Sequence, residues 1–318
     1  MPTLDLLNAL PRRSFLVGTS VAVGAAALPG SAVADGHDAS TKTSSAFDFE
    51  DPAKNVAVMA RLAGDMSGER AGHVHYSGRA FGTLPGEPIV PLYGIEGMSS
   101  TKTLPVEDGK FRFLFSEFAI YTDLETGKPL SKWTNPYTNE TLPVWHQRNG
   151  PVNFALSPKM NAFGGFNATQ AAPAFRLPWR MIDGTASFAL DVTSKRKNPL
   201  LPEKWPRESS GATMFVSEHS QYFVSPVDLA NDAITDLSFH ASLQSNKPWH
   251  PWMMMGQQPG GVFARLYARK VPGIEALDPS VAEVASTHLA SFVEAPAEWT
   301  GTYKTAHSIY AATMQPVK

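Results

Sequence analysis

The chain contains no cysteine in its 318 residues. This absence excludes disulfides, thiolate zinc sites, cysteine-held iron–sulfur clusters and a cysteine nucleophile. Charged residues make up only 18% of the chain, the formal net charge is −2, and no basic run occurs outside the N-terminal segment. Nucleic-acid-binding domains generally carry a clustered basic surface, so we expect no nucleic-acid partner.

Short motifs that identify a reaction are also missing. The sequence has no G-x-S-x-G elbow, no Walker loop, no G-x-G-x-x-G after a strand, no EF-hand loop and no H-E-x-x-H. No repeat of the length found in solenoids or propellers is present. The sequence therefore leaves any cofactor of the protein unknown.

Proline, glycine and phenylalanine are abundant, with 26, 24 and 18 residues respectively. Proline and glycine mark turns, whereas aromatic residues favour strands. With 43% hydrophobic residues, the chain is globular rather than disordered. Many short segments joined by turns favour a β architecture.

The N-terminal segment, residues 1–34, has the pattern of a twin-arginine export signal. Arg12 and Arg13 precede a mildly apolar run over 17–28, and small residues follow at the signal-peptidase spacing, ending at Ala34. The alternative is a membrane anchor, but the run is too short to cross about 30 Å of hydrocarbon as a helix. We expect cleavage after Ala34, residence in the periplasm, the twin-arginine export machinery as a partner, and no stable membrane span.

The composition changes after this signal. Small polar residues predominate, so residues 35–50 are predicted to form a flexible linker. Residues 51–318 are expected to fold as a single β-rich, barrel-like domain. A helix that packs on or plugs the sheet is predicted over 52–62, and a second helix over 279–292.

The stretch 111–149 contains the clearest strand pattern. If its first run is a strand, alternation places one set of side chains on a single face: Phe111, Phe113, Phe115, Glu117, Ala119 and Tyr121. Turn-rich breaks at 123–128 and 134–140 then predict a three-stranded antiparallel meander, whose last strand carries Trp145 and His146.

Further strands are predicted on both sides of this stretch, over 72–82, 89–99, 101–105, 175–181, 185–193, 213–224, 233–243 and 261–270. Residues 151–174 are expected to form a long loop with Phe163 and Phe166 tucked under it. Strands that follow one another through turns give an antiparallel sheet, and a sheet of about nine or ten strands tends to curl. We predict a mainly β fold: an antiparallel barrel or strongly curved sheet with a few peripheral helices. Its interior would suit a hydrophobic small molecule.

Three residues are the candidate acid–base groups. Glu117 lies among phenylalanines, where a buried carboxyl suits proton transfer; its alternative role is a structural ion pair. His146 follows Trp145, and His219 lies near Tyr222; an imidazole beside an aromatic wall can shuttle protons near neutral pH. We expect Glu117, His146 and His219 to converge on one cavity. The alternative for each histidine is a structural role.

Two other groups of residues suggest binding. Trp145, Trp249, Trp252 and Tyr222 are candidate walls of a ligand pocket, with core packing as the alternative. His73 and His75 are two residues apart on a predicted strand, so both could ligate one metal. Further ligands would have to come from elsewhere, with these candidates: His146, His219, Glu117 and Glu218. The alternative is that the pair lies on a solvated face, and no metal ligand is assigned.

Several motifs together resemble a bacterial family known only as domain of unknown function 1838. The resemblance rests on the paired arginines and on these residues: Trp133, Asn135, Pro136, Thr138, Asn139, Glu140, His146, Asn149, Trp252, Met255 and Gly256. Family members commonly carry glycine where this chain has Asn139, which preserves a turn because asparagine tolerates positive φ. The resemblance implies an exported domain over most of the chain after about residue 50 and implies no established activity.

Two functions are compatible with these observations. The first is an exported lyase, isomerase or hydratase that uses acid–base chemistry on an apolar or aromatic small molecule. The second is a periplasmic carrier of a hydrophobic ligand, in which the histidines are structural. A histidine-ligated metal protein is a third possibility.

Overall fold

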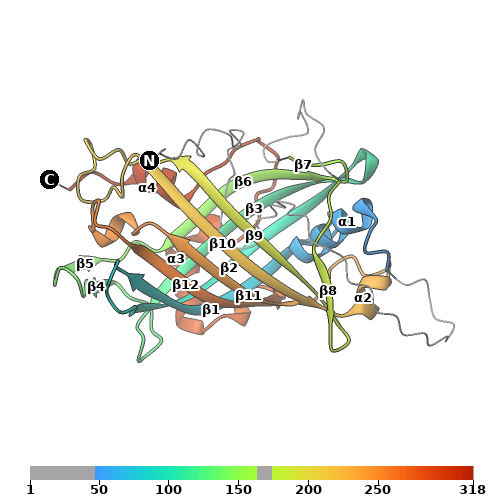
Figure 1. Cartoon of the computed structure of the whole chain (residues 1–318), viewed down its shortest axis with the longest axis horizontal. Coiled ribbons are helices and arrows are strands. Elements are labelled where there is room, and N and C mark those ends of the chain that lie inside the picture. Colours follow the sequence, from blue (N-terminus) through green and yellow to red (C-terminus); the bar gives the residue numbers. More distant parts are fainter. Residues whose placement is uncertain (1–46, 163–173, 318) are drawn as a thin grey trace, which may run out of the picture.

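A computed structural model describes residues 47–162 and 174–317 (Figure 1). The predicted signal, its cleavage site and most of the linker lie outside the described residues, as do Phe163 and Phe166. Residues 47–50, which the linker was predicted to include, are not loose. Phe47 is buried, and its ring packs edge-on against Phe49 and Trp179.

Within the described ranges, ten strands form one sheet, and every pair is antiparallel. The strands are β1 Ala71–Thr83, β2 Val90–Val106, β3 Lys110–Thr122, β6 Gln147–Ser157, β7 Met160–Ala162, β8 Trp179–Ile182, β9 Thr185–Lys197, β10 Thr213–Val224, β11 His240–Lys247 and β12 Gly261–Val271. Their order across the sheet is β7-β6-β3-β2-β1-β12-β11-β10-β9-β8. Two sequential meanders are thus joined where β1 pairs with β12.

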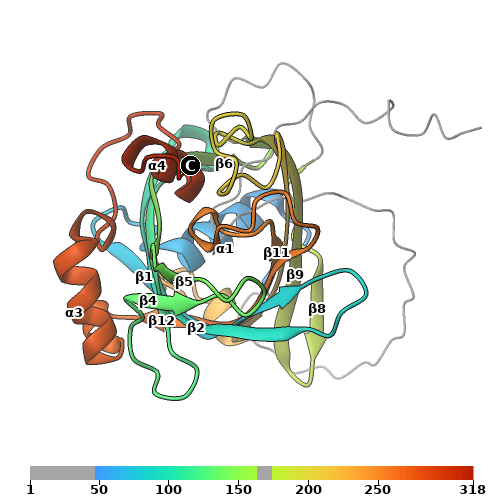
Figure 2. The same ribbon diagram turned by 90° about the vertical axis from the view of Figure 1, so that its left-hand side faces the viewer.

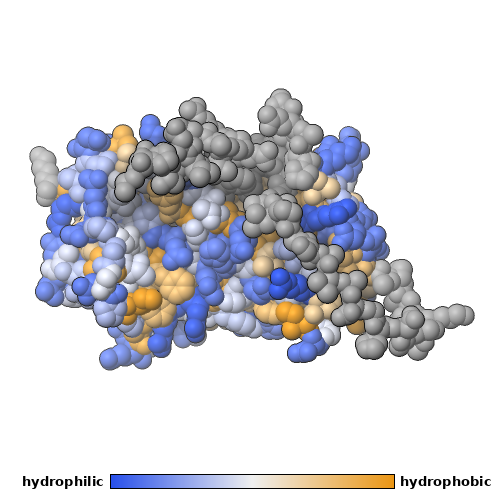
Figure 3. Space-filling model, in the orientation of Figure 1, coloured by the Kyte–Doolittle hydropathy of each residue, from blue (hydrophilic) through white to orange (hydrophobic). Residues whose placement is uncertain are grey.

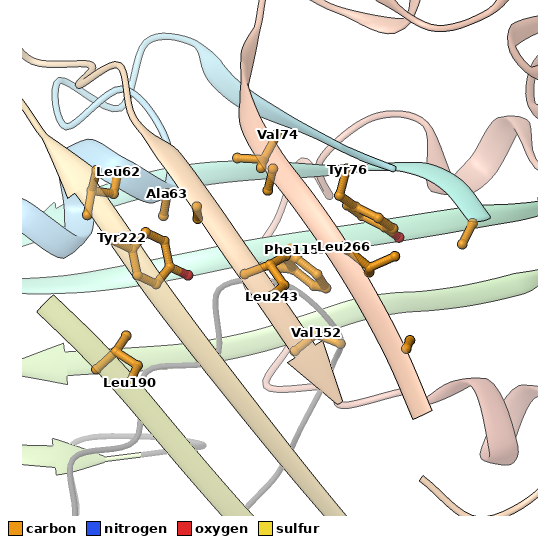
Figure 4. Packing of buried hydrophobic residues seen from close by; sticks show 14 of the residues in the cluster. Leu62, Ala63, Val74, Tyr76, Phe115, Val152, Leu190, Tyr222, Leu243 and Leu266 are labelled. Atoms are coloured by element: carbon orange, nitrogen blue, oxygen red, sulfur yellow. The ribbon is translucent and has the colours of Figure 1, made fainter. Parts of the chain in front are cut away.

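The sheet is strongly curled into a half-barrel, with helix α1 (Pro52–Ala63) inside the curl (Figure 2). The predicted mainly β, antiparallel, curved fold is therefore confirmed. Residues on the inner face of both meanders point toward one interior, as Val74, Phe115, Leu190 and Leu266 show (Figure 4). Period-two alternation places these apolar side chains inward and their polar neighbours outward.

Helix α1 fills one part of the interior, as its sequence predicts. Asp51 accepts a hydrogen bond from the Ala53 N–H, and Pro52 occupies the first turn, so the start is well capped. Its buried residues lie all round the helix, which fits a helix enclosed by a sheet. Buried Arg61 donates to the carbonyls of Leu229 and Asn231, next to the short helix α2 (Pro226–Ala230).

Helix α3 (Pro279–His288) covers part of the outer surface. Its Val281 and Ala285 pack with Met98 and Phe118, which point outward from β2 and β3. Strand β3 is therefore buried on both faces. The predicted helix over 279–292 ends earlier, and a 3₁₀ turn, η4 (Ala290–Phe292), follows it.

The C-terminal segment completes the edge of the half-barrel beside β6. The Gly150 N–H donates to the Lys304 carbonyl, the Lys304 N–H donates to the Pro151 carbonyl, and Val152 bridges Tyr303. Helix α4 (Ala306–Thr313) follows, capped by Thr305 and packed beside β6. This segment was not predicted, because it has too few residues of alternating pattern to read as a strand.

The predicted meander over 111–149 is wrong in its pairing. β3 pairs with β2 and β6, whereas β4 (Lys132–Thr134) and β5 (Thr141–Pro143) form a separate two-stranded hairpin. The two hairpin strands have three residues each. They are too short to pair along β3, which has 13 residues. The hairpin turn has Asn139 at φ 58°, the positive value expected at this position.

The predicted long loop over 151–174 is also partly wrong. Residues 151–157 continue β6, with Val152, Phe154 and Leu156 facing the core, and β7 follows. The composition misled because Gly150 and Pro151, which normally mark a turn, lie inside β6 and do not end it. No helix among the described residues is long and apolar enough to cross a membrane.

Candidate functional site

A cavity lies inside the half-barrel, between the walls formed by β1, β11 and β12 on one side and β2, β3 and β6 on the other. It has about 20 Å³ of space for a water-sized molecule. Its lining mixes apolar side chains with polar groups from five different parts of the chain: Tyr76, Tyr121, Gln147, Ser245, Lys247 and His250. Polar groups convergent on an otherwise apolar interior are the usual mark of a binding or catalytic site.

Glu117 is fully buried just behind one wall of this cavity. The Tyr76 hydroxyl donates to its Oε1 at 2.8 Å, and Asn149 Nδ2 donates to its Oε2 at 2.6 Å. The Asn149 Oδ1 in turn accepts from the Ala306 N–H at 2.6 Å, which ties the carboxylate to the first turn of α4. Two donors thus fix the orientation of a buried carboxylate.

The contact between Tyr76 and Glu117 crosses an intervening strand. Tyr76 on β1 is opposite Gly97 on β2, and Gly97 is opposite Ala119 on β3. A Cβ at Gly97 would lie 2.7 Å from the Tyr76 hydroxyl oxygen and 2.4 Å from the Phe118 carbonyl oxygen. The absence of a side chain at Gly97 is therefore what lets the phenol lie flat over β2 and reach the carboxylate.

Tyr76 remains protonated in this environment. Burial raises the pKa of Tyr76 well above its ordinary value, and the negative charge of Glu117 raises it further. A phenol that keeps its proton is a hydrogen-bond donor, and the Tyr76 hydroxyl lies 2.8 Å from both Glu117 Oε1 and the Phe118 carbonyl oxygen, while the Tyr76 side chain also lines the cavity. Tyr76 is thus the group that connects the buried carboxylate to the cavity.

A second buried acid approaches the interior from the other meander. Glu218 on β10 forms an ion pair with Lys247 on β11, with 3.4 Å between Oε1 and Nζ, and their side chains are only 9% and 15% exposed. Burial raises the pKa of Glu218, while Lys247 and Arg196 act in the opposite direction. Both Glu117 and Glu218 contribute to raising the pKa of Tyr303, so the two acids act on the same interior.

Lys247 has hydrogen-bond donors to spare for a molecule in the cavity. An ammonium group has three donors, and Glu218 is the acid it pairs with. The cavity is lined by Lys247 itself, next to Ser245 and His250. The geometry therefore offers a positive hydrogen-bond donor to an oxygen atom placed in the cavity.

Two histidines missed by the sequence reasoning are buried near Lys247. Burial lowers the pKa of His250 to about 3, and the charge of Lys247 lowers it further. Burial also lowers the pKa of His307 on α4 well below its ordinary value, and Arg196 adds to the effect. The Nε2 atom of His307 is buried without a hydrogen-bond partner. Both imidazoles are therefore neutral at ordinary pH.

His146 is close to the site but outside the cavity lining. Its Nδ1 accepts from the Tyr121 backbone N–H at 3.1 Å, and burial lowers its pKa to about 4. Tyr121 lies four residues beyond Glu117 on β3, so the backbone at Tyr121, where His146 binds, is roughly 13 Å from the backbone at Glu117. His146 therefore buttresses Tyr121, whose ring lies 5.5 Å from His250 and does line the cavity.

The expected convergence of Glu117, His146 and His219 is wrong for His219. Its side chain is 45% exposed on the outer face of β10, where Nδ1 lies 2.9 Å from Asp191 Oδ1. Tyr222 and Glu218 face inward, and residues an odd number of positions apart on a strand point to opposite faces. The sequence could have placed Glu218 inside, because it is an even number of residues from Tyr222 on the same strand and therefore shares its face.

The four predicted aromatic wall residues are in the core or at its edge, and none lines this cavity. Trp252 packs on Tyr93, Tyr121 and Trp133 at centroid distances of 5.4–5.7 Å. Tyr222 stacks on Phe188 in the core.

The other two tryptophans are anchored by polar groups. The Trp249 indole donates to the Gln258 carbonyl. Trp145 carries the Arg148 guanidinium at 4.2 Å from its ring and packs on Tyr310.

His73 and His75 face away from the interior. His73 Nδ1 lies 2.8 Å from Ser100 Oγ, and His75 Nε2 lies 3.1 Å from Glu96 Oε1. The sequence pattern correctly placed both on one strand face, but that face is opposite to the one bearing Tyr76. In the described ranges, no three His, Asp or Glu side chains are grouped so as to hold a metal ion.

The chain belongs to a family described as proteins of unknown function, DUF1838, whose model matches residues 69–313. The match starts just before β1 and ends at the last residue of α4, so it covers the sheet, the cavity and every residue described above as part of the site. The family resemblance noted in the sequence is thereby confirmed over these residues, whereas the paired arginines lie outside the match. No curated protein sequence matches the chain.

Proposed function

We propose that the chain is an enzyme, a lyase, isomerase or hydratase, that moves a proton on a small, mostly apolar molecule bearing an oxygen atom. One observation carries this proposal: two buried acids, Glu117 and Glu218, are each hydrogen-bonded or ion-paired to a group that lines the same cavity. Buried ionisable groups are a weak source of stability, and they cluster at functional sites.

The roles follow from the donors and acceptors. Lys247 donates to the substrate oxygen and stabilises the negative charge that develops on it when a neighbouring C–H bond is broken. The Tyr76 oxygen takes that proton while its own proton passes to Glu117 Oε1 along the 2.8 Å hydrogen bond. Return of the proton to another carbon completes an isomerisation, and loss of a leaving group completes an elimination. His250 and Tyr121 shape the cavity beside the reacting atoms.

The size of the cavity limits what enters without movement. Its space suffices for about one water, because a water needs about 10–15 Å³ on this measure. A larger substrate therefore has to displace lining side chains. The segment that supplies His250 leads into the 3₁₀ turn η2 (Pro251–Met253), whose residues are buried, so room for a larger substrate on this side requires repacking of the core.

The proposed chemistry predicts hydrogen exchange with solvent. The protein is incubated in D₂O with a library of small ketones, phenols and unsaturated alcohols, and NMR detects compounds that gain deuterium. Glu117→Gln should lower the rate of exchange by about 10²–10⁴-fold, the usual contribution of one general base. His240→Asn, an exposed histidine on the outer face, is the matched control and should leave the rate unchanged. An active protein whose Glu117→Gln variant exchanges at the original rate would contradict the proposal.

The competing function is carriage of a hydrophobic ligand, supported by the aromatic cluster of Tyr93, Tyr121, Trp133 and Trp252 beside the cavity. Native mass spectrometry of protein isolated from its own cell separates the two. A lipid or terpenoid that co-purifies unchanged, with no exchange activity on any library compound, favours carriage. Exchange without a retained ligand favours catalysis.

We also propose that the chain is exported by the twin-arginine route and acts in the periplasm. The support is in the sequence: paired Arg12 and Arg13, an apolar run and the small residues before Ala34. Replacing both arginines by lysine should leave the uncleaved protein in the cytoplasmic fraction. N-terminal sequencing of the periplasmic form should give Asp35 as the first residue. A different first residue would contradict cleavage after Ala34.

A further inference from the structure

The outer face of the half-barrel carries a group of arginines on neighbouring strands. Arg79 on β1 and Arg265 and Arg269 on β12 are all exposed, with Tyr267 between the last two. We call these four residues, together with His240 on β11, the arginine face. Figure 3 shows hydrophilic and hydrophobic side chains mixed on the side of the molecule where these strands cross.

The strand register brings like charges into direct opposition on this face. Arg79 is the cross-strand partner of Arg265, and Arg269 is flanked by His75 on one side and His240 on the other. Like charges directly opposite in a sheet destabilise it. The Arg79–Arg265 pair therefore contributes nothing to the stability of the sheet and holds two guanidinium groups side by side.

The three guanidinium groups are also without acidic partners on the protein. Among the described residues, Arg79, Arg265 and Arg269 make no ion pair with an aspartate or glutamate. Two acids on the neighbouring strands have other partners: Asp191 contacts His219, and Glu96 contacts His75. The three guanidinium groups can therefore attract an anionic partner.

The side chains between the arginines indicate what kind of anion fits. Ser242, Gln244 and Asn246 on β11 point outward, with the last two exposed. The Tyr267 ring is 49% exposed and stacked with His240, to whose Nδ1 its hydroxyl is hydrogen-bonded. Amide and hydroxyl groups bind sugar hydroxyls, an exposed flat ring packs against a sugar ring, and arginine binds carboxylate in a bidentate way.

We propose that the arginine face binds a linear acidic polysaccharide, one whose sugar units carry carboxylates. Neighbouring strands are about 4.8 Å apart, so the rows of polar and positive side chains form a continuous surface on the outside of the curled sheet, across β1, β12, β11 and β10. Apolar side chains are also present on this face. Phe81 and Phe263 lie beside the arginines but are half-buried and pack against each other, and exposed Phe215 on β10 lies under Lys195, so they do not form the protruding apolar group that a membrane surface would call for. The proposal is independent of the chemistry in the cavity, since these side chains lie on the opposite side of the sheet.

The test measures binding of the full mature protein to polygalacturonate by isothermal titration at several salt concentrations. Wild-type protein should bind, with an affinity that falls as salt rises. The double variant Arg79→Gln/Arg265→Gln should bind at least 10-fold more weakly. Lys128→Gln/Lys132→Gln removes the same charge from exposed lysines elsewhere and should bind within twofold of wild type.

The same variants show whether the protein remains folded. Because Arg79 and Arg265 repel each other, their replacement should keep or raise the midpoint of thermal unfolding, so weakened binding would not reflect unfolding. The proposal is overturned if polygalacturonate does not bind at low salt, if the lysine control weakens binding equally, or if the arginine variant binds normally. Tighter binding to phosphatidylglycerol vesicles or to duplex DNA than to polygalacturonate would also overturn it.

Discussion

At the scale of single residues, Gly97 decides whether the site exists. Its lack of a side chain lets Tyr76 cross β2 and donate to Glu117 on β3. The sequence placed Glu117 on an inward face correctly, from the alternation of Phe111, Phe113 and Phe115. It could not identify Tyr76 as the partner, because that contact depends on the register of three strands.

Gly97→Ala tests this dependence. The added Cβ would come within 2.4 Å of the Phe118 carbonyl oxygen and 2.7 Å of the Tyr76 ring, so backbone or ring must shift. Overpacking of this kind costs about 1–3 kcal/mol, which denaturant unfolding measures as a lower midpoint. Ser77→Ala, beside Tyr76 but facing outward, is the control and should change stability by less than about 0.5 kcal/mol. An unchanged midpoint for Gly97→Ala would show that the close packing is not needed.

At the scale of elements, the edge of β6 is the feature that the sequence did not reveal. The expected three-stranded meander and the expected loop over 151–174 both failed here, because β3 pairs with β6 across the intervening hairpin β4–β5. On the side away from β3, β6 pairs with β7 and, nearer its start, with the C-terminal segment around Lys304, about 150 positions along the chain. Local patterns carry no information about partners at that separation.

Lys304→Pro should expose that edge. Proline removes the N–H that donates to the Pro151 carbonyl at 3.0 Å. We expect a loss of about 1–3 kcal/mol and faster amide exchange at Gly150 and Asn153, whose N–H groups donate to the same segment. Lys304→Ala keeps the N–H, so the amides of Gly150 and Asn153 should exchange at the wild-type rate in this variant. Equal protection in the two variants would mean that the segment does not hold β6.

At the scale of the whole molecule, the barrel interior holds neutral histidines that an unfolded chain would protonate. The pKa of His146 is lowered to about 4 and that of His250 to about 3, both chiefly by burial. The unfolded chain titrates its histidines near 6.5 and so binds more protons between these values. Stability is therefore complete above about pH 6.5 and falls as the pH decreases toward the folded-state values.

Between pH 7 and pH 5, each of these two histidines should remove about 2 kcal/mol from the free energy of unfolding. Glu218 acts in the opposite sense, since burial raises its pKa and the folded state then binds a proton more readily as pH falls. Urea unfolding at several pH values measures the net slope. His146→Gln should make this slope shallower by the contribution of one histidine. A slope unaffected by His146→Gln would contradict a buried neutral imidazole.

The sequence alone determined the fold class, the inward face of β3, the capped helix α1 and the family. These features depend on alternation, capping residues and short motifs, which are properties of neighbouring residues. Only the tertiary structure decided which side chains meet: Tyr76 with Glu117, Glu218 with Lys247, and His250 rather than His219 at the cavity. Each meeting depends on strand register and on the direction of curling, and a shift of one residue in register would turn the same side chains to the opposite face.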